Sequence, residues 1–257
     1  MLILIAESKT MSPRENTVAP EEYAAHMPVC EPDAGRIMEL LHGMTADELL
    51  RETKLSRAMT ARLQQMVYEF PNKSRGYKAI EAYTGVVFKA LDYKTLDDVG
   101  RTALADRVRI ISSLYGWLRP DDIVKPYRLD FTMPLAPEAR RLAAFWKGSV
   151  TEHLIKEAKA RGCKYVLNLL PGDAERCIDI KALGEDMELW KVDFREMQPG
   201  GRLATPNANR LKTLRGQLLR LIIPRGITSP QELMTADTDR YMAELMPSRC
   251  ITLTTAL

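Results

Sequence analysis

The chain has 257 residues, of which 46% are hydrophobic and 28% are charged, and this is the composition of an ordinary globular protein. A chain of this length buries enough surface to fold without disulfide or metal staples, so small stapled scaffolds, collagen-like repeats and disordered chains are excluded. Its 37 basic and 34 acidic residues leave a net charge of +3, which excludes a histone-like polycation but permits a local basic surface.

The first half of the chain is predicted to be mainly helical after an initial strand. Residues 2–6 form a continuous apolar run typical of a short buried strand, and residues 11–32 carry four prolines without periodicity, which predicts a loop. The pattern Thr45-Ala46-Asp47-Glu48 is a capping box that opens a short helix. Further helices are predicted over about 33–44, 56–70, 78–91 and 95–106.

The second half alternates strands and helices. Strands are predicted at 109–115, 164–170, 187–194 and 249–254, and residues 116–137 form a proline-punctuated loop. Helices are predicted over about 138–161, closed by Gly162, over about 207–223, and from Ser229-Pro230 onward. The predicted fold is a single compact α/β domain over residues 1–257, with a mainly helical insertion at about 33–106.

The sequence contains no familiar cofactor or hydrolase motif. We find no G-x-G-x-x-G, G-x-x-x-x-G-K-[ST], G-x-S-x-G or H-E-x-x-H pattern. The three histidines fall in different predicted elements without a cysteine at ligand spacing, so we expect no metal and no cofactor. The four cysteines lack C-x-x-C spacing, and no apolar run is long enough for a signal peptide or membrane helix. We therefore expect a cytoplasmic protein without a membrane partner.

The densest set of candidate residues lies between 114 and 130. Two prolines stiffen this loop, and it presents Arg119, Lys125, Tyr127 and Arg128, a combination that suits binding to phosphates or bases. The alternative is a structural loop whose arginines pair with Asp121, Asp122 and Asp130.

Three other places supply candidate cations. No acidic residue occurs from Met197 to Gln231, a segment that includes Lys212 and Arg215, although an amphipathic helix with a basic outer face would look the same. Lys9 follows the first strand, at a position that lines ligand crevices in open α/β sheets. Lys54 and Arg57 lie in a basic link between two short helices, which could form a hairpin that offers backbone N–H groups to a phosphate.

Several short motifs occur in order along the chain. They are Met1-Leu2-Ile3-Leu4-Ile5, Ser8-Lys9-Thr10, Tyr83-Thr84-Gly85, Leu114-Tyr115-Gly116, Leu118-Arg119-Pro120, Pro126-Tyr127-Arg128-Leu129, Phe145-Trp146, Asn168-Leu169, Arg215-Gly216 and Ile222-Ile223. In this order the chain resembles the YaaA-like peroxide stress proteins over nearly its whole length. It departs from them at Ala6-Glu7-Ser8-Lys9-Thr10, where the family has Ser-Pro-Ala-Lys-Thr, and at Leu170-Pro171-Gly172-Asp173, which replaces the Ser/Glu/Tyr pattern expected after Asn168-Leu169.

The resemblance implies a cytosolic protein that protects against hydrogen peroxide and binds duplex or branched DNA without strong sequence choice. It also implies a positively charged cleft and a helix–hairpin–helix-like element.

Our first hypothesis is a non-enzymatic, monomeric DNA-binding stress protein, whose cleft is lined by Lys9, Arg119, Tyr127, Arg128, Lys212 and Arg215. The second is an enzyme acting on a nucleotide or a damaged base, in which Lys9 is a nucleophile or phosphate clamp and Tyr127 or Asp130 is an acid–base group. An enclosed cavity with a desolvated Lys9 favours the enzyme, and a long open groove favours binding alone.

Overall fold

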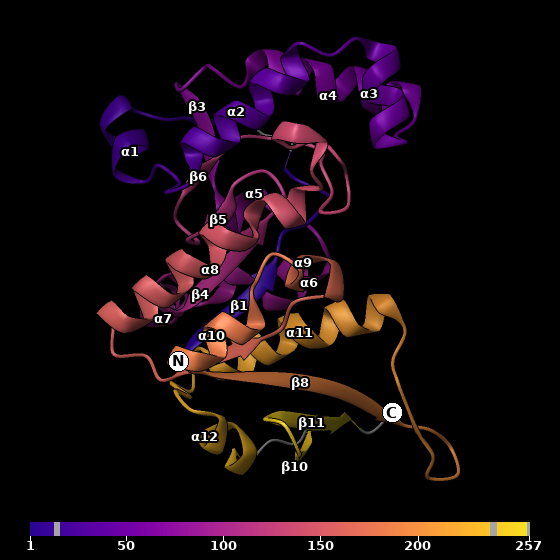
Figure 1. Cartoon of the computed structure of the whole chain (residues 1–257). Helices are drawn as coiled ribbons and strands as arrows, with labels where there is room; N and C mark the ends of the chain where they lie inside the picture. Colours follow the sequence, from indigo (N-terminus) through magenta and orange to yellow (C-terminus); the bar gives the residue numbers. More distant parts are fainter. Residues whose placement is uncertain (13–15, 237–240, 256–257) are drawn as a thin grey trace.

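The sheet at the centre of the molecule is mixed, and β1 lies in its interior (Figure 1). The computed structural model describes residues 1–12, 16–236 and 241–255. Within them, eight strands form one sheet in the order β10-β11-β8-β7-β1-β4-β5, with β9 paired to β8, and β2, β3 and β6 form a second, smaller sheet. The strands are β1 (Leu2–Ala6), β2 (Asn16–Thr17), β3 (Arg75–Lys78), β4 (Val108–Ser112), β5 (Gly116–Leu118), β6 (Ile123–Val124), β7 (Tyr165–Asn168), β8 (Glu188–Met197), β9 (Leu203–Ala204), β10 (Met242–Met246) and β11 (Cys250–Thr255).

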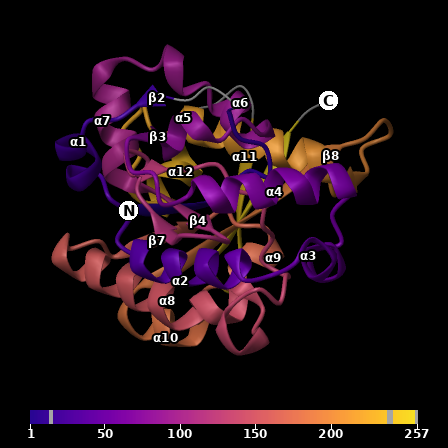
Figure 2. The same ribbon diagram turned by 90° about the horizontal axis from the view of Figure 1, so that it is seen from above.

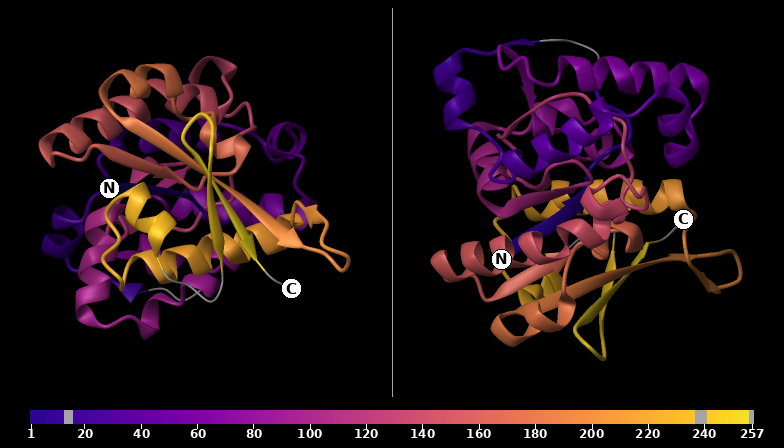
Figure 3. Two further views of the ribbon diagram at one scale, coloured as in Figure 1. Left: turned by 90° about the horizontal axis from the view of Figure 1, so that it is seen from below. Right: turned by 45° about the horizontal axis from the view of Figure 1, so that its top comes forward.

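Helices surround the central sheet. They are α1 (Pro20–Ala25), α2 (Glu31–His42), α3 (Ala46–Thr53), α4 (Arg57–Glu69), α5 (Ala79–Ala82), α6 (Val86–Leu91), α7 (Asp98–Arg107), α8 (Leu142–Ala160), α9 (Gly172–Glu175), α10 (Ile180–Asp186), α11 (Ala208–Ile222) and α12 (Pro230–Thr235). Helices α8 and α10 cover one face of the sheet, and α7 and α11 cover the other (Figure 2). Helices α2, α3 and α4 form a separate layer on the far side from β8, β10 and β11 (Figure 3).

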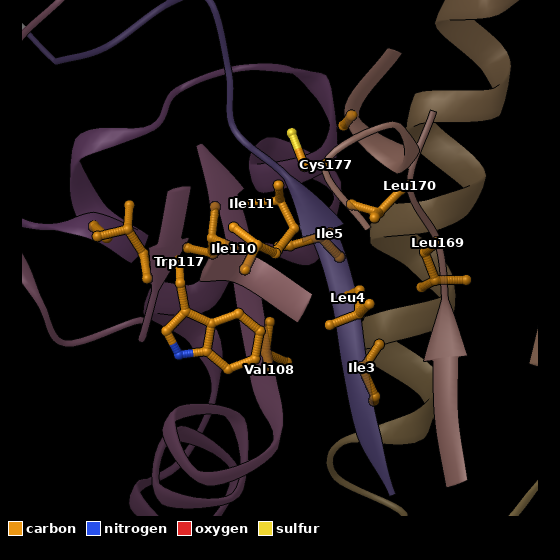
Figure 4. Close-up of a cluster of buried hydrophobic side chains, with 14 of the residues drawn as sticks. Ile3, Leu4, Ile5, Val108, Ile110, Ile111, Trp117, Leu169, Leu170 and Cys177 are labelled. Carbon is orange, nitrogen blue, oxygen red and sulfur yellow. The ribbon is translucent and has the colours of Figure 1, made fainter. Parts of the chain in front are cut away.

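The apolar sequence of β1 follows from its position. It pairs in parallel with β4 on one side and with β7 on the other, so both of its faces are covered and every position from Leu2 to Ile5 is buried. Figure 4 shows Ile3, Leu4 and Ile5 beside side chains of the neighbouring strand β4, among them Val108 and Ile110. The buried cluster they belong to continues into α2, α4 and α11, so the chain folds around one core as a single domain.

The predicted α/β class is confirmed, as are most of the predicted elements. The capping box at Thr45 is present: Thr45 Oγ1 accepts from the Glu48 N–H, and the Glu48 side chain accepts from the Thr45 N–H. Ser229 caps α12 as expected. For α7 the cap is Asp97, because its Oδ1 accepts from the Gly100 N–H at 2.8 Å, whereas Thr95 lies in a preceding 3-10 turn.

Other predictions were wrong. The helix predicted over 78–91 is broken into α5 and α6, because the Thr84 N–H is taken by the Thr10 carbonyl and Gly85 is extended. The loop predicted over 11–32 contains β2 and α1, and its residues 13–15 lie outside the described ranges. Strand β3 interrupts the helical insertion, β5 and β6 lie in the predicted loop 116–137, and β10 was not predicted.

The turn between β4 and β5 generates a stability prediction. Gly116 has φ +62°, and a Cβ there would lie 2.5 Å from the ring of Trp146, whereas Gly162 has φ +61° with no described atom within 4 Å of its would-be Cβ. The left-handed backbone costs either alanine variant about 1–2 kcal/mol. Overpacking costs Gly116→Ala a further amount of about 1–3 kcal/mol. Urea unfolding of the two variants measures the difference, and equal losses would contradict it.

Candidate functional site

Two cavities meet at Lys9, just beyond the carboxyl end of β1. Because β1 runs parallel to β4 and β7, the carboxyl ends of these strands lie at one edge of the sheet, where open α/β sheets bind ligands. The first, which we call the β1 cavity, has a volume of about 390 Å³ and lies between the end of β1, the start of α6 and α11. The second, the hairpin cavity, has a volume of about 540 Å³ and is lined by residues 51–55, by segment 128–134 and by Arg141.

Glu7 lies in the wall of the β1 cavity and is held by three hydrogen bonds. Its carboxylate accepts from the Ser113 N–H at 2.8 Å, from the Ser113 hydroxyl at 2.6 Å and from the Tyr127 hydroxyl. Since Tyr127 donates its only hydroxyl proton to Glu7, the hydroxyls of Tyr83 and Ser112, each 2.7 Å away, donate to Tyr127. Burial raises the pKa of Glu7 to about 7, against the lowering effect of its hydrogen bonds with Ser113 and Tyr127. Glu7 is therefore an acid that titrates near neutral pH.

Lys9 is held at both its side chain and its backbone. Its ammonium forms an ion pair with Asp130, and its carbonyl oxygen accepts a hydrogen bond from the guanidinium of Arg128. The Lys9 side chain is 58% exposed, whereas that of Asp130 is only 14% exposed. Segment 128–130 therefore fixes the position of Lys9 between the two cavities and leaves its ammonium accessible.

Helix α11 contributes two cations to the β1 cavity, Lys212 and Arg215. They are three residues apart and so project from one face of the helix. Lys212 is exposed, and Arg215 is partly buried with no ion pair or hydrogen bond to any described residue. Burial lowers the pKa of Arg215, while the nearby charge of Asp173 acts in the opposite direction. Arg215 is therefore a partly buried cation that has a nearby carboxylate in Asp173 but no directly bonded partner among the described residues.

Two other cations of the acid-free segment are bound within the fold. Arg210 forms an ion pair with Glu196 at 2.5 Å, and Arg220 donates to the Asp92 carbonyl at 3.0 Å. The partners of Arg210 and Arg220 thus come from outside the segment.

The link between α3 and α4 consists of residues 54–56. Lys54 ends α3 with φ +56°, a left-handed conformation that glycine adopts more readily, and Ser56 caps α4 by accepting from the Met59 N–H at 3.3 Å. Lys54 and Arg57 are exposed, and neither forms an ion pair with a described residue. Lys54 lines the hairpin cavity; Arg57 lies at the start of α4, outside that lining.

The linings of the two cavities together hold more cations than carboxylates. Their lining includes seven cations and four carboxylates, a surplus equal to the net charge of +3 of the whole chain. The cations are Lys9, Arg51, Lys54, Arg128, Arg141, Lys212 and Arg215, and the carboxylates are Glu7, Glu52, Asp130 and Asp173.

The structure does not bring the predicted residues of loop 114–130 to one surface. Lys125 is buried, donates to the Phe70 carbonyl and lies 5.3 Å from the centre of the Phe70 ring. Tyr127 is buried under Glu7, and Arg119 is exposed but lines neither cavity. Of the four, only Arg128 lies in the site. The reason is that β5 and β6 pair with β4 and β3 and carry the loop into the interior.

The alternative interpretation of this loop is also only partly right. Asp122 accepts from the backbone N–H of Arg119 at 2.7 Å, but Asp130 pairs with Lys9, and the Arg128 guanidinium binds a carbonyl. The loop is thus structural in large part, with partners other than those expected.

Sequence reasoning missed Glu7, Tyr83, Asp173 and Arg141. Glu7 had a usable signal, because an acidic residue directly after a buried strand falls at the ligand-binding edge of a parallel sheet. Asp173 lies in residues 170–173, where the sequence departs from the family motifs. Arg141 was placed inside a predicted helix starting near 138, but α8 begins only at Leu142.

Within residues 1–12, 16–236 and 241–255, no group of three or more histidine, cysteine or acidic side chains is placed to hold a metal ion. In the same ranges no helix is both long and apolar enough to cross a membrane. The four cysteines are free thiols.

Comparison with known proteins gives one family. The family model described as "Peroxide stress protein YaaA" matches residues 1–245. The UPF0246 protein of Parabacteroides distasonis is 30% identical over 236 residues, which cover 91% of this chain and 90% of the relative. That of Rhizorhabdus wittichii is 28% identical over 248 residues, or 94% and 93% of the two chains. A UPF0246 protein of Ruegeria is 36% identical over 153 residues, 59% of each chain.

The raised pKa of Glu7 predicts a particular pH dependence of stability. In the unfolded chain this carboxyl titrates near 4.5, and in the folded protein near 7. Between these values the folded state binds more protons, so its stability falls as pH rises, by at most about 1.4 kcal/mol per pH unit, and levels off above about 7. Glu7→Gln, neutral at every pH, will remove this contribution.

Asp122 provides the control, because burial raises its pKa to about 7 as well. Urea unfolding of the wild type, Glu7→Gln, Asp122→Asn and the double variant between pH 4.5 and 8 separates the two contributions. A slope in Glu7→Gln identical to that of the wild type would show that Glu7 is not the titrating group.

Proposed function

The chain belongs to the peroxide stress protein YaaA family, and from this membership we propose that it acts in peroxide stress by binding DNA through phosphate contacts. The proposed partner is duplex or branched DNA, bound without strong sequence choice by a monomer in the cytoplasm. The proposed surface is formed by the β1 cavity and the hairpin cavity, with Lys9 at their junction.

The observation that carries this proposal is the concentration of unpaired cations along the two cavities. Lys54, Arg141, Lys212 and Arg215 line them without an ion pair to any described residue, and Lys9 keeps an accessible ammonium beside Asp130. Cations of this kind gain affinity for DNA by releasing counterions from phosphates, and such contacts carry no sequence information. A basic surface without base-reading side chains fits non-specific binding.

The α3–α4 hairpin supports the same proposal. A helix–hairpin–helix element needs two short helices, a tight link and free N–H groups at the start of the second helix, where a phosphate binds. Here Ser56 accepts from the Met59 N–H, which leaves the preceding N–H groups of α4 available beside two exposed cations, Lys54 and Arg57. The usual glycine at the left-handed position is replaced by Lys54, which adds a charge at the tip.

The enzyme hypothesis receives less support. It required a desolvated Lys9, but this side chain is 58% exposed and forms an ion pair with Asp130. A lysine in that setting suits a phosphate contact better than nucleophilic attack.

Salt dependence tests the proposal. With about four or five phosphates neutralised, the logarithm of the association constant for a duplex will fall with the logarithm of salt concentration at a slope of about −4. Affinity will then drop by roughly two orders of magnitude between 50 and 200 mM salt. Lys54→Ala and Arg141→Ala will each flatten the slope by about one, equally for unrelated sequences.

The matched control is Lys156→Ala. Lys156 is an exposed lysine near the other end of α8, about 20 Å along the helix from Arg141, and lies outside both cavities. Its removal changes the net charge by the same amount and should leave the slope unchanged. A duplex slope near zero, or equal effects of all three variants, would refute binding at this surface.

A further inference from the structure

The β1 cavity has features that phosphate contacts alone do not require. Its volume of about 390 Å³ falls within the range of about 300–1,000 Å³ of small-molecule sites. Much of its wall is apolar, with Val86, Phe88, Phe131 and Leu169 among its lining residues. Apolar walls gain nothing from a solvated phosphodiester backbone, so they indicate a ligand with a flat or apolar part.

The cationic side of the cavity is rigidly placed. Gly216 lies where α11 meets α6, and a Cβ on it would be 2.2 Å from the Val87 carbonyl oxygen. This close approach fixes the neighbouring Arg215 against the start of α6. An ionic group that is partly buried without a partner is costly, and a ligand phosphate that pairs with it recovers that cost. Lys212, one turn earlier and exposed, lies on the same side of the cavity.

Carboxylates lie in the wall of the same cavity. Glu7 is held in place by Ser113 and Tyr127, and Asp173 comes from the first turn of α9. Fixed carboxylate oxygens accept hydrogen bonds from amino and imino groups and repel a second anion. The cavity therefore combines an anion-binding side, an apolar wall and acceptors for N–H groups.

We propose that the β1 cavity binds a single nucleotide, with its phosphate on Arg215 and Lys212, its base against the apolar wall, and base N–H groups on Glu7 or Asp173. A sugar phosphate lacks the flat apolar face, and a free nucleobase lacks the anion. The same chemistry comes from two sources, a free mononucleotide or an unpaired nucleotide of a DNA strand. The second source rests on the proposed function, because Lys9 joins this cavity to the hairpin cavity.

Equilibrium binding of labelled AMP to the full chain tests the pocket. AMP should bind at least tenfold more tightly than adenosine or inorganic phosphate. Val86→Trp, which places a bulky ring in the cavity from the first residue of α6, should abolish AMP binding. Lys212→Ala removes only an exposed side chain, so it should fold normally and weaken AMP at least tenfold without affecting adenosine. The control Lys156→Ala should bind AMP like the wild type.

The DNA source is tested with two duplexes that differ by one unpaired 2-aminopurine. If the nucleotide enters the cavity, its fluorescence rises on binding, AMP reverses the rise, and Val86→Trp abolishes the rise. If AMP binds as stated but the fluorescence does not change, the pocket stands with the free nucleotide as its ligand.

The two proposals fail in different ways. The nucleotide-pocket proposal is overturned if two results are found together. These are that AMP binds no more tightly than phosphate, and that 2-aminopurine fluorescence changes equally with Val86→Trp and with the wild type. Salt-dependent binding of the paired duplex would then still stand. If AMP binds in the cavity and no duplex binds, the DNA proposal fails and the pocket remains.

Discussion

The hydrogen bonds of Glu7 hold together segments that are far apart in the chain. Its carboxylate joins the end of β1 to Ser113, 106 residues away, and to Tyr127, 120 residues away. Two residues beyond Glu7, Lys9 contacts Arg128 and Asp130, which lie one and three residues after Tyr127. The position of Lys9, and so the junction of the two cavities, depends on a half-buried carboxyl whose ionised form is disfavoured by its desolvation. The site is therefore built on a group that the rest of the fold has to stabilise.

A second constraint sets the opposite wall. Helix α11 approaches α6 closely only because position 216 lacks a side chain. The contact places Lys212 and Arg215 over the end of β1, whereas Arg210 and Arg220, on the same helix, are directed to Glu196 and to the carbonyl of Asp92. One amphipathic helix thus divides its charges between structural contacts and an open cavity.

What could be predicted from the sequence was local. The buried strand β1, the capping box at Thr45 and the cap at Ser229 each depend on a few adjacent residues, and each is confirmed. The break between α5 and α6 depends on Thr10, and the burial of Lys125 depends on Phe70, so neither follows from a local pattern. Strand β10 has mostly exposed side chains and therefore shows no alternation. Lys9 was found from its place after a buried strand, and Arg128 from its proline-stiffened loop. Lys212 and Arg215 were found because their segment has no acidic residue. Glu7, in contrast, acquires its role from residues more than 100 positions away.

The exposed cations at the two cavities and the partly buried Arg215 interact with anions in physically different ways. Around the hairpin cavity, Lys54 and Arg141 are exposed, so they act through a field that salt screens over about 8–10 Å. Such charges attract any polyanion and distinguish poorly between ligands. Arg215 is partly buried in an apolar cavity, where screening is weaker and an unpaired charge is costly. An anion that reaches it must fit the cavity as well as carry charge. Lys9 lines both cavities. A polyanion attracted to the exposed cations of the hairpin cavity would therefore bring parts of itself to the opening of the β1 cavity.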